Sequence, residues 1–253
     1  MNRTVAILSR TVVTGSRVAK LSCSLAALLV FLLIGSNISA QNPQTAPPTQ
    51  EQLAKRYNSL YQDPNQTRFS TEPNELLVVA TKDVKPGTAL DVSMGQGRNA
   101  VYLAGKGWDV TGFDIADEGM RVAREHAAAI GKNIKTVHAT LEDFDYGKER
   151  WDLIYFIYTE ASLADPNYVA RIYAALKPGG LVVADRPYRS LTNPQPGWIE
   201  FPEDKVNALA KSFSGSFQIV FYEDTIGHAD WQQTREDRLK TDMRLVRLVA
   251  RKR

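Results

Sequence analysis

The feature that most constrains this chain is a strand, a glycine turn and a helix in direct succession. Residues 89–92 are a short apolar run between turn residues, which predicts an inner strand. Gly95 and Gly97 follow, and glycine adopts backbone angles that are closed to other residues. Residues 98–106 predict a helix that Gly107 ends. The first-turn N–H groups of this helix lack partners and would face a ligand above the glycines, so the segment predicts a nucleotide-binding element.

Two carboxylates bear on the ligand that suits this turn. Residues 108–113 predict a second strand that ends on Asp114, where a carboxylate accepts hydrogen bonds from both hydroxyls of a ribose. Residues 95–100 satisfy the G-x-G-x-x-A fingerprint of dinucleotide binding, so an NAD(P)-dependent oxidoreductase is one interpretation. Asp91 argues against it, because a carboxylate at the end of the first strand faces a pyrophosphate unfavourably. The same carboxylate suits a ligand with a positively charged amino-acid end.

These residues resemble motif I of the class I S-adenosylmethionine-dependent methyltransferases, [D/E]-x-G-x-G-x-G. The motif lies over Asp91, Ser93, Gly95 and Gly97. Asp114 falls at the ribose-binding acid of the family, and the run Leu-Lys-Pro-Gly-Gly-Leu-Val-Val from residue 176 resembles its turn into strand five. The resemblance extends over roughly residues 57–251. It implies S-adenosylmethionine as the cofactor and methyl transfer to a small-molecule acceptor.

The resemblance also assigns the cofactor-binding residues. These are Asp91, Ser93, Gly95, Gly97, Asp114, Ile115, Glu142 and Asp143. In the family, an acid after the third strand reaches the adenine amino group, a role that falls here on Glu142 or Asp143. Ser93 departs from the family pattern, because it stands where the first glycine of the motif is usual. A non-catalytic exported binding protein that keeps the fold and has lost the cofactor is therefore a further alternative.

The acceptor is expected at the carboxyl end of strand four. Glu160 is the candidate catalytic base for a hydroxyl acceptor, and its alternative role is that of a helix-capping or surface carboxylate. Tyr158 and Tyr188 are candidate walls of the acceptor pocket, or packing residues. Arg186 either pairs with an anionic acceptor or forms a surface ion pair. The enzyme's contribution is expected to be mainly positioning and the exclusion of water.

The alternation of strand and helix patterns predicts an α/β fold. We expect a Rossmann-like, doubly wound, seven-stranded and mostly parallel sheet, with helices on both faces and the last strand antiparallel. Strands besides those above are expected at residues 134–138, 151–158, 217–222 and 245–250, and near 181–183. Further helices are expected at residues 52–61, 117–130, 165–176 and 202–213, and the connection 227–243 is expected to be a long loop or a hairpin.

The N-terminus is predicted to be separate from the fold. Residues 1–40 carry four basic and no acidic side chains before the apolar run 25–34, a pattern typical of a signal peptide cut after Ala40. The alternative is an uncleaved anchor that contacts the membrane through residues 18–38. Residues 41–50 read as a proline-rich linker, and the domain is expected from residue 51 onward. Localisation is then periplasmic, secreted or membrane-anchored, and cytoplasmic if the start site is mis-assigned.

Charge and composition exclude other classes. The net charge of the chain is +3, but residues 41–253 hold 27 basic against 28 acidic side chains, a net charge of −1. Binding to nucleic acid is therefore disfavoured, because it requires a surplus of Lys and Arg. His126, His138 and His228 are far apart and Cys23 is the only cysteine, so no metal site is expected. Nothing in the sequence specifies an oligomeric state.

Overall fold

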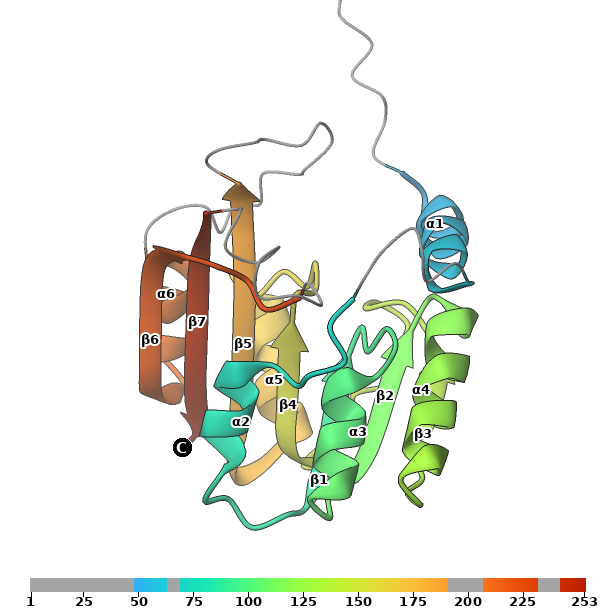
Figure 1. Ribbon diagram of the computed structural model, residues 1–253. Coiled ribbons are helices and arrows are strands. Elements are labelled where there is room, and N and C mark those ends of the chain that lie inside the picture. Colours follow the sequence, from blue (N-terminus) through green and yellow to red (C-terminus); the bar gives the residue numbers. More distant parts are fainter. Residues whose placement is uncertain (1–47, 63–68, 191–206, 232–241) are drawn as a thin grey trace, which may run out of the picture. The chain divides into compact units, whose positions relative to one another are not determined.

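The computed structural model of the chain describes residues 48–62, 69–190, 207–231 and 242–253, except for the side chains of residues 188–190. These residues form one sheet in the order β3-β2-β1-β4-β5-β7-β6 (Figure 1). The pairs among the first five strands are parallel, and β7 runs antiparallel to both β5 and β6. The strands are β1 (Thr88–Val92), β2 (Asp109–Asp114), β3 (Lys135–His138), β4 (Trp151–Ile157), β5 (Leu176–Ser190), β6 (Phe217–Gly227) and β7 (Met243–Lys252).

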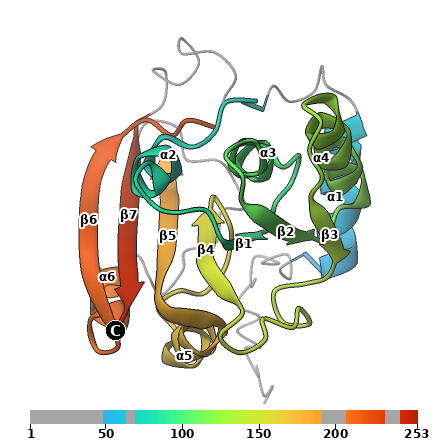
Figure 2. The ribbon, with the colours of Figure 1, turned by 90° about the horizontal axis from the view of Figure 1, so that it is seen from below.

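Helices cover both faces of this sheet, as expected for a doubly wound fold. One face carries α2 (Glu75–Thr81), α3 (Arg98–Gly105) and α4 (Asp117–Ala129), and the other carries α5 (Pro166–Ala175) and α6 (Ala208–Ser214) (Figure 2). Helix α1 (Gln50–Gln62) packs against α4. The predicted α/β class, the seven strands and the antiparallel last strand are confirmed.

The core consists of two apolar layers, one on each face of the sheet. Strand β4 shows why, because its side chains alternate between the layers. Leu153 and Tyr155 belong to the layer under α2, α3 and α4, whereas Ile154 and Phe156 belong to the layer under α5 and α6. All four are fully buried. A central parallel strand that is covered on both faces is apolar along its whole length, which is the pattern the sequence shows.

Helix α2 is an element that the sequence analysis missed. Its apolar run Leu-Leu-Val-Val also suits a strand, but Asn74 places its Oδ1 atom 3.1 Å from the backbone nitrogen of Leu77 and so caps a helix. Helix α5 begins close to its predicted start, where Asp165 caps it by accepting a hydrogen bond from the backbone N–H of Asn167 at 2.9 Å. The Asn74 cap and the burial of Leu77 against the sheet thus favour a helix at residues 75–81.

Parts of several predictions lie outside the described residues. These parts are the predicted signal peptide or anchor at 1–40, most of the linker 41–50, the first residues of the predicted helix 202–213, and residues 232–241 of the long connection. In the described part of that connection, β6 continues to Gly227 and β7 begins at Met243, so both strands are longer than predicted. None of the helices in the described segments is long and apolar enough to cross a membrane.

Candidate functional site

The candidate site lies at the carboxyl ends of the parallel strands, where the glycine turn follows β1. Asp91 pairs in register with Gly112 of β2 and with Tyr155 of β4, so it stands in the middle of the sheet. Asp185 lies on β5 in register with Ile157, the last residue of β4. The topology therefore brings the turn, Asp114 and the ends of β4 and β5 to one edge. In open α/β sheets this is the edge that binds ligands.

The glycine turn requires backbone conformations that only glycine adopts without strain. The φ angles of Gly95 and Gly97 are +51° and +70°. At Gly97 a Cβ atom would lie 2.6 Å from the Cβ atom of Ala123, so this glycine lets the start of α3 pack closely against α4. The two glycines thus have different roles, because at Gly95 the nearest atom to such a Cβ belongs to the Tyr61 side chain.

Asp114 connects the turn to the start of α4. Its Oδ2 atom accepts a hydrogen bond from the backbone N–H of Gly95 and its Oδ1 atom accepts one from Ala116, both at 2.8 Å. Burial raises the pKa of this carboxyl, and the backbone donors partly counteract that rise. A carboxylate has about four lone-pair positions, so each oxygen keeps capacity for a further donor such as a ribose hydroxyl.

Asp91 is a buried acid with an unused oxygen. Only 3% of the residue is exposed, and its Oδ2 atom has no hydrogen-bond partner among the described residues. Burial raises its pKa to about 8, and the neighbouring charge of Asp114 adds to the effect. Burial raises the pKa of the neighbouring Tyr155 hydroxyl, and the charge of Asp91 adds to that rise. A cation beside Asp91 would relieve this arrangement, because it favours the ionised form.

Ser93 adopts a left-handed backbone conformation that favours glycine. Its φ angle is +56°, in the left-handed region where a side chain costs roughly 1–2 kcal/mol. The Ser93 Oγ atom lies 3.1 Å from the Oγ1 atom of Thr159, which follows β4, so the two hydroxyls form a hydrogen bond. The turn therefore keeps a glycine-like backbone at this position, and the Ser93 side chain is directed to the end of β4.

Helix α1 supplies a site residue that the sequence analysis did not name, Tyr61. A Cβ atom on Gly95 would lie 2.6 Å from the Tyr61 hydroxyl. Burial raises the pKa of this hydroxyl, and so do the charges of Asp114 and Asp91, so the phenol lies close to both acids. The helix is held there by a hydrogen bond from the backbone N–H of Glu118 to Asn58. The helix was predicted, but only its docking places Tyr61 over the turn.

The other predicted cofactor residues lie farther along the same edge. Ile115 directly follows Asp114, and its backbone N–H helps to lower the pKa of that acid. The loop after β3 begins beside that acid, since the backbone N–H of Ala139 donates to the Asp114 carbonyl at 3.1 Å. Glu142 and Asp143 are exposed in this loop, where Asp143 accepts a hydrogen bond from the Thr140 hydroxyl. Among the described residues no hydrogen bond joins either acid to Asp91 or Asp114.

Of the predicted acceptor-side residues, the described side chains of Tyr158, Glu160 and Arg186 differ in their surroundings. Glu160 is exposed, and its charge raises the pKa of Tyr57, so it lies on the α1 side of the edge. Tyr188 belongs to β5, but its side chain is outside the described part of the structure. Arg186 is only 3% exposed and donates a hydrogen bond to the Ala161 carbonyl. The expected surface position of Arg186 is therefore wrong, because the side chain is buried.

Tyr158 is the predicted acceptor residue that the structure surrounds most completely. Its φ angle is +59°, which is a genuine outlier for a bulky residue. Its hydroxyl donates to the Asp230 Oδ1 atom at 2.7 Å, and the guanidinium carbon of Arg98 lies 5.6 Å from the centre of its ring. The hydroxyl and the ring of Tyr158 thus both contact the protein, and the strained backbone holds them at the carboxyl edge of the sheet.

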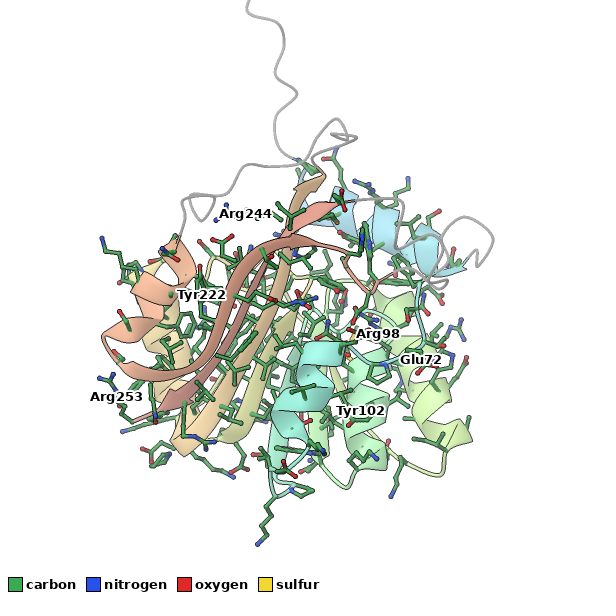
Figure 3. All side chains as sticks on the ribbon, turned by 60° about the vertical axis from the view of Figure 1, so that its left-hand side comes forward. Glu72, Arg98, Tyr102, Tyr222, Arg244 and Arg253 are labelled. Atoms are coloured by element: carbon green, nitrogen blue, oxygen red, sulfur yellow. The ribbon has the colours of Figure 1, made fainter. Side chains whose placement is uncertain are left out.

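Tyr158 belongs to a group of side chains that we call the polar cluster: Asn74, Arg98, Tyr158, Asp185 and Asp230. Asn74 donates from its Nδ2 atom to Asp185 at 2.8 Å and to Asp230 at 3.1 Å. Arg98 donates to the Asp230 carboxylate at 2.7 Å and to the Glu72 carbonyl at 2.9 Å, and Figure 3 shows Arg98 and Glu72 side by side. The cluster joins segments that are far apart in the sequence and walls the edge beside β4 and β5.

The two acids of the polar cluster differ in their charge balance. Burial alone would raise the pKa of Asp230, but Arg98 and the Tyr158 hydroxyl outweigh it and lower that pKa. Asp185 is fully buried, and burial raises its pKa to about 6 although Arg247 lies 3.4 Å from its Oδ2 atom. Its Oδ1 atom has no hydrogen-bond partner among the described residues. Asp185 shared the sequence signal of Asp91 and Asp114, an acid at the end of an apolar strand, and was overlooked.

Within the described residues, no three His, Cys, Asp or Glu side chains are grouped so as to hold a metal ion.

The chain is similar in sequence to known proteins through residues 89–180, which match the family described as methyltransferase domain. A ubiquinone biosynthesis O-methyltransferase from Cereibacter sphaeroides is 37% identical over 95 residues, which are 37% of this chain and 38% of the relative. The protein of the same name from Serratia proteamaculans is 37% identical over 97 residues, 38% of this chain and 40% of the relative. The match therefore spans about two fifths of the length of these relatives.

Solved structures are similar over more of the chain at lower identity. One, from work on the conversion of a disulfide bond into a thioacetal group during echinomycin biosynthesis, has a TM-score of 0.59 at 20% identity and covers 79% of this chain and 93% of that one. The [4+2]-cyclase SpnF has a TM-score of 0.57 at 17% identity, with coverage of 81% and 97%. TehB from Haemophilus influenzae has a TM-score of 0.52 at 21% identity, with coverage of 70% and 61%. At these identities the likeness establishes the fold alone.

Proposed function

We propose, from the premise that this chain belongs to the class I S-adenosylmethionine-dependent methyltransferase family, that it transfers a methyl group from S-adenosylmethionine to a small-molecule acceptor. The membership rests on the domain match over residues 89–180 and on the strand order of the sheet. The observation that carries the proposal is the buried Asp91 oxygen without a partner beside the glycine turn. Such an atom costs about 1–3 kcal/mol unless a ligand uses it.

The residues at this edge fit the cofactor. Asp91 would hold the amino-acid end, because an ammonium group pairs with a buried carboxylate. Asp114 would accept the ribose hydroxyls on the lone pairs that Gly95 and Ala116 leave free. Tyr61 lies over Gly95, so a bound cofactor would contact this ring or displace it. Ile115, Glu142 and Asp143 would follow along the adenosine end.

The acceptor would bind beside Tyr158, at the ends of β4 and β5. When bound, S-adenosylmethionine supplies a methyl group on a sulfonium, which a nucleophile displaces. The protein's part is to align the acceptor and exclude water, and the buried polar cluster provides a rigid wall for that purpose. A hydroxyl acceptor must also lose its proton. Glu160 suits that role because it is exposed at the end of β4, where an entering acceptor can reach it.

The residues of this site also bear on two alternative functions. An NAD(P)-dependent oxidoreductase is disfavoured, since the free oxygen of Asp91 would face a pyrophosphate. A protein that keeps the fold without methylating is the more serious rival, because one structure with the same fold is described as a [4+2]-cyclase. For localisation, we keep the proposal that residues 1–40 export or anchor the domain, with membrane contact limited to residues 18–38.

Calorimetry with S-adenosylhomocysteine on the full chain tests the cofactor proposal. We expect saturable binding that Asp91→Asn weakens about 10- to 100-fold, since a hydrogen bond to a charged group contributes about 1.5–3 kcal/mol. Asp185→Asn is the matched control, because it is a buried acid of the same edge that faces Arg247 instead of the glycine turn. Equal losses in both variants, or heat from NADH and none from S-adenosylhomocysteine, would contradict the assignment.

Methyl transfer itself is tested with a cell extract as the source of acceptors. The full chain is incubated with the small-molecule fraction of the extract and S-adenosylmethionine that carries a labelled methyl group. We expect the label in one or a few products, and none with Asp91→Asn. Cofactor binding without any labelled product would support the non-methylating reading.

A further inference from the structure

A concave apolar groove lies on the face of the sheet that α2 covers, away from the glycine turn. It has a volume of about 440 Å³ and is lined by α2 and by strands β5, β6 and β7. From α2 come Leu76, Val79 and Ala80, and from the strands come Leu181, Phe221 and Val249. In Figure 3, α2 lies in front of the sheet beside β7. Ligand pockets in proteins have volumes of about 300–1,000 Å³, so the groove is large enough for a small molecule.

The groove exists because a single helix is too narrow to cover this face. With its side chains a helix is about 10–12 Å wide, roughly the width of two strands, whereas the three strands β5, β7 and β6 end the sheet here. The pairing of β6 with β7 is irregular between Ile219 and Phe221, at Val220. Such a bulge changes the direction of the neighbouring side chains. Val79, Val220 and Phe221 consequently remain 73%, 53% and 42% exposed.

The strand register gives this groove a polar end and a cationic end. At the carboxyl edge, Arg247 is paired with Asp185 and Glu223, which lie 3.4 Å and 3.2 Å away. Glu75 also lines this end, so acids outnumber cations there. At the opposite end, Arg251 is in register with Leu181 of β5. The row between them consists of Val183, Val249 and Phe221 and is entirely apolar.

Arg251 provides a charge without an acidic counterpart. The side chain is exposed and donates one hydrogen bond to the Gly179 carbonyl at 2.9 Å. Within the described part of the chain it forms no ion pair with an acid. Its guanidinium keeps further donors in a planar arrangement that matches a carboxylate. An anion at this end would be attracted, whereas the acids at the other end would repel one.

From these observations we propose that the groove binds an amphipathic anion with a single hydrocarbon chain, such as a fatty acid. The carboxylate pairs with Arg251 and the chain lies along Val249 and Phe221 under Val79. A hydrocarbon chain suits the middle of the groove, because that part offers apolar surface and no hydrogen-bonding side chain. Because the surface is concave, it can surround a single hydrocarbon chain but cannot lie flat against a membrane. This site is separate from the cofactor site and does not depend on methyl transfer.

The test measures the fluorescence of dansyl-undecanoic acid on the full chain. We expect saturable enhancement, displaced by dodecanoate more strongly than by dodecanol. Val79→Glu should lower the affinity about tenfold, because it places an acid at the lip of the apolar groove. Ile226→Glu is the matched control: Ile226 is 53% exposed on β6 but does not line the groove, so we expect a change below about twofold.

The charged end is tested with Arg251→Met, which keeps most of the apolar stem. We expect dodecanoate to bind about three- to fivefold more weakly and dodecanol to be unaffected, as for an exposed ion pair of up to about 1 kcal/mol. Circular dichroism spectra and Tm values of Val79→Glu and Arg251→Met should match those of the wild type, which shows that the variants fold. Absence of saturable enhancement, or equal losses in Val79→Glu and Ile226→Glu, would overturn the proposal. Equal weakening of dodecanoate and dodecanol by Arg251→Met would overturn the assignment of the anionic end.

Discussion

Asp91 and Asp185 are buried acids on the same face of the sheet, each with an oxygen that lacks a partner among the described residues, but their surroundings differ. Asp185 has a cation of the protein, Arg247, at 3.4 Å and a donor from Asn74 at 2.8 Å. Asp91 has the like charge of Asp114 nearby, and the Tyr155 hydroxyl and the charge of Arg98 do not offset its burial. Burial therefore raises the pKa of Asp185 to about 6 and that of Asp91 to about 8.

This difference distinguishes Asp185, which has a structural role in the polar cluster, from Asp91, which is placed to bind a ligand. The protein itself supplies most of what the Asp185 carboxylate needs, so Asp185 can hold the polar cluster together without a ligand. Asp91 remains short of a positive charge, and a ligand can supply one. Buried titratable groups that lack compensation within the protein are found preferentially at functional sites.

The largest expected effect concerns stability against pH. In an unfolded chain the pKa of aspartate is about 3.9, so between that value and about 8 the folded state keeps a proton on Asp91 that the unfolded state releases. The free energy of unfolding therefore falls as the pH rises through this window. Asparagine does not titrate, so Asp91→Asn should gain stability over the wild type by about 3 kcal/mol between pH 5 and pH 8.

Thermal unfolding of Asp91→Asn and Asp185→Asn against the wild type measures this. The gain of Asp91→Asn should appear as a Tm difference that grows by about 6–12 °C up to pH 8. For Asp185→Asn the difference should level off above about pH 6. If both differences level off at the same pH, the two acids have the same environment and the comparison fails.

The next largest effect is expected from Asn74→Ala, which breaks the polar cluster. The variant loses the cap of α2 and the donor that Asp185 and Asp230 share. We expect a loss of about 2–4 kcal/mol in the free energy of unfolding. Chemical denaturation checks this, with Asn167→Ala on the exposed surface of α5 as the control, which should change stability by less than about 0.5 kcal/mol. Equal losses in the two variants would mean that the polar cluster does not contribute to the free energy of unfolding.

A smaller effect, on cofactor affinity at the site around Asp91, is expected from Tyr61→Phe. The hydroxyl lies against Gly95, and a hydrogen bond from it to a ligand would contribute about 1 kcal/mol, so S-adenosylhomocysteine should bind about fivefold more weakly. Tyr57→Phe serves as the control on the same helix. If Tyr61→Phe binds more tightly than the wild type, the ring blocks the cofactor position and does not line it.

The smallest effect is expected from Ser93→Gly. Glycine removes the strain of a φ angle of +56°, but it also loses the hydrogen bond to Thr159 and gains conformational entropy when unfolded. These terms nearly cancel, so stability should change by less than about 1 kcal/mol. Ser93→Ala keeps the strain without the hydrogen bond and should be the less stable of the two. The reverse order in denaturation experiments would show that the backbone at Ser93 is not strained.

The cofactor-binding part of the candidate site could be predicted from the sequence because its residues are close together in the chain. Asp91, Gly95 and Gly97 lie within one strand–turn–helix unit, and Asp114 ends the next strand, so short-range rules of strand, turn and helix place them together. The seven strands and the antiparallel β7 followed from the family resemblance, whereas the order of the strands in the sheet was not predicted. Helix α2 was missed, since its apolar run suits a strand and only the Asn74 cap favours a helix.

The acceptor side could not be predicted in the same way. Asn74, Tyr158, Asp185 and Asp230 come from four distant segments, and nothing in their spacing indicates that they share hydrogen bonds. Arg186 shows the same limit, because its burial on the opposite face depends on the pleat of β5 and on the packing of residues near Ala161.

The sequence by itself therefore determined the succession of strands and helices along the chain and the glycine turn. The reason is that the strand and helix periods and the conformations of glycine depend on only a few neighbouring residues. Only the tertiary structure decided which buried charges find partners. Burial, distance and hydrogen bonding set the pKa of a carboxyl, and all three depend on side chains that the fold brings together from separate parts of the chain.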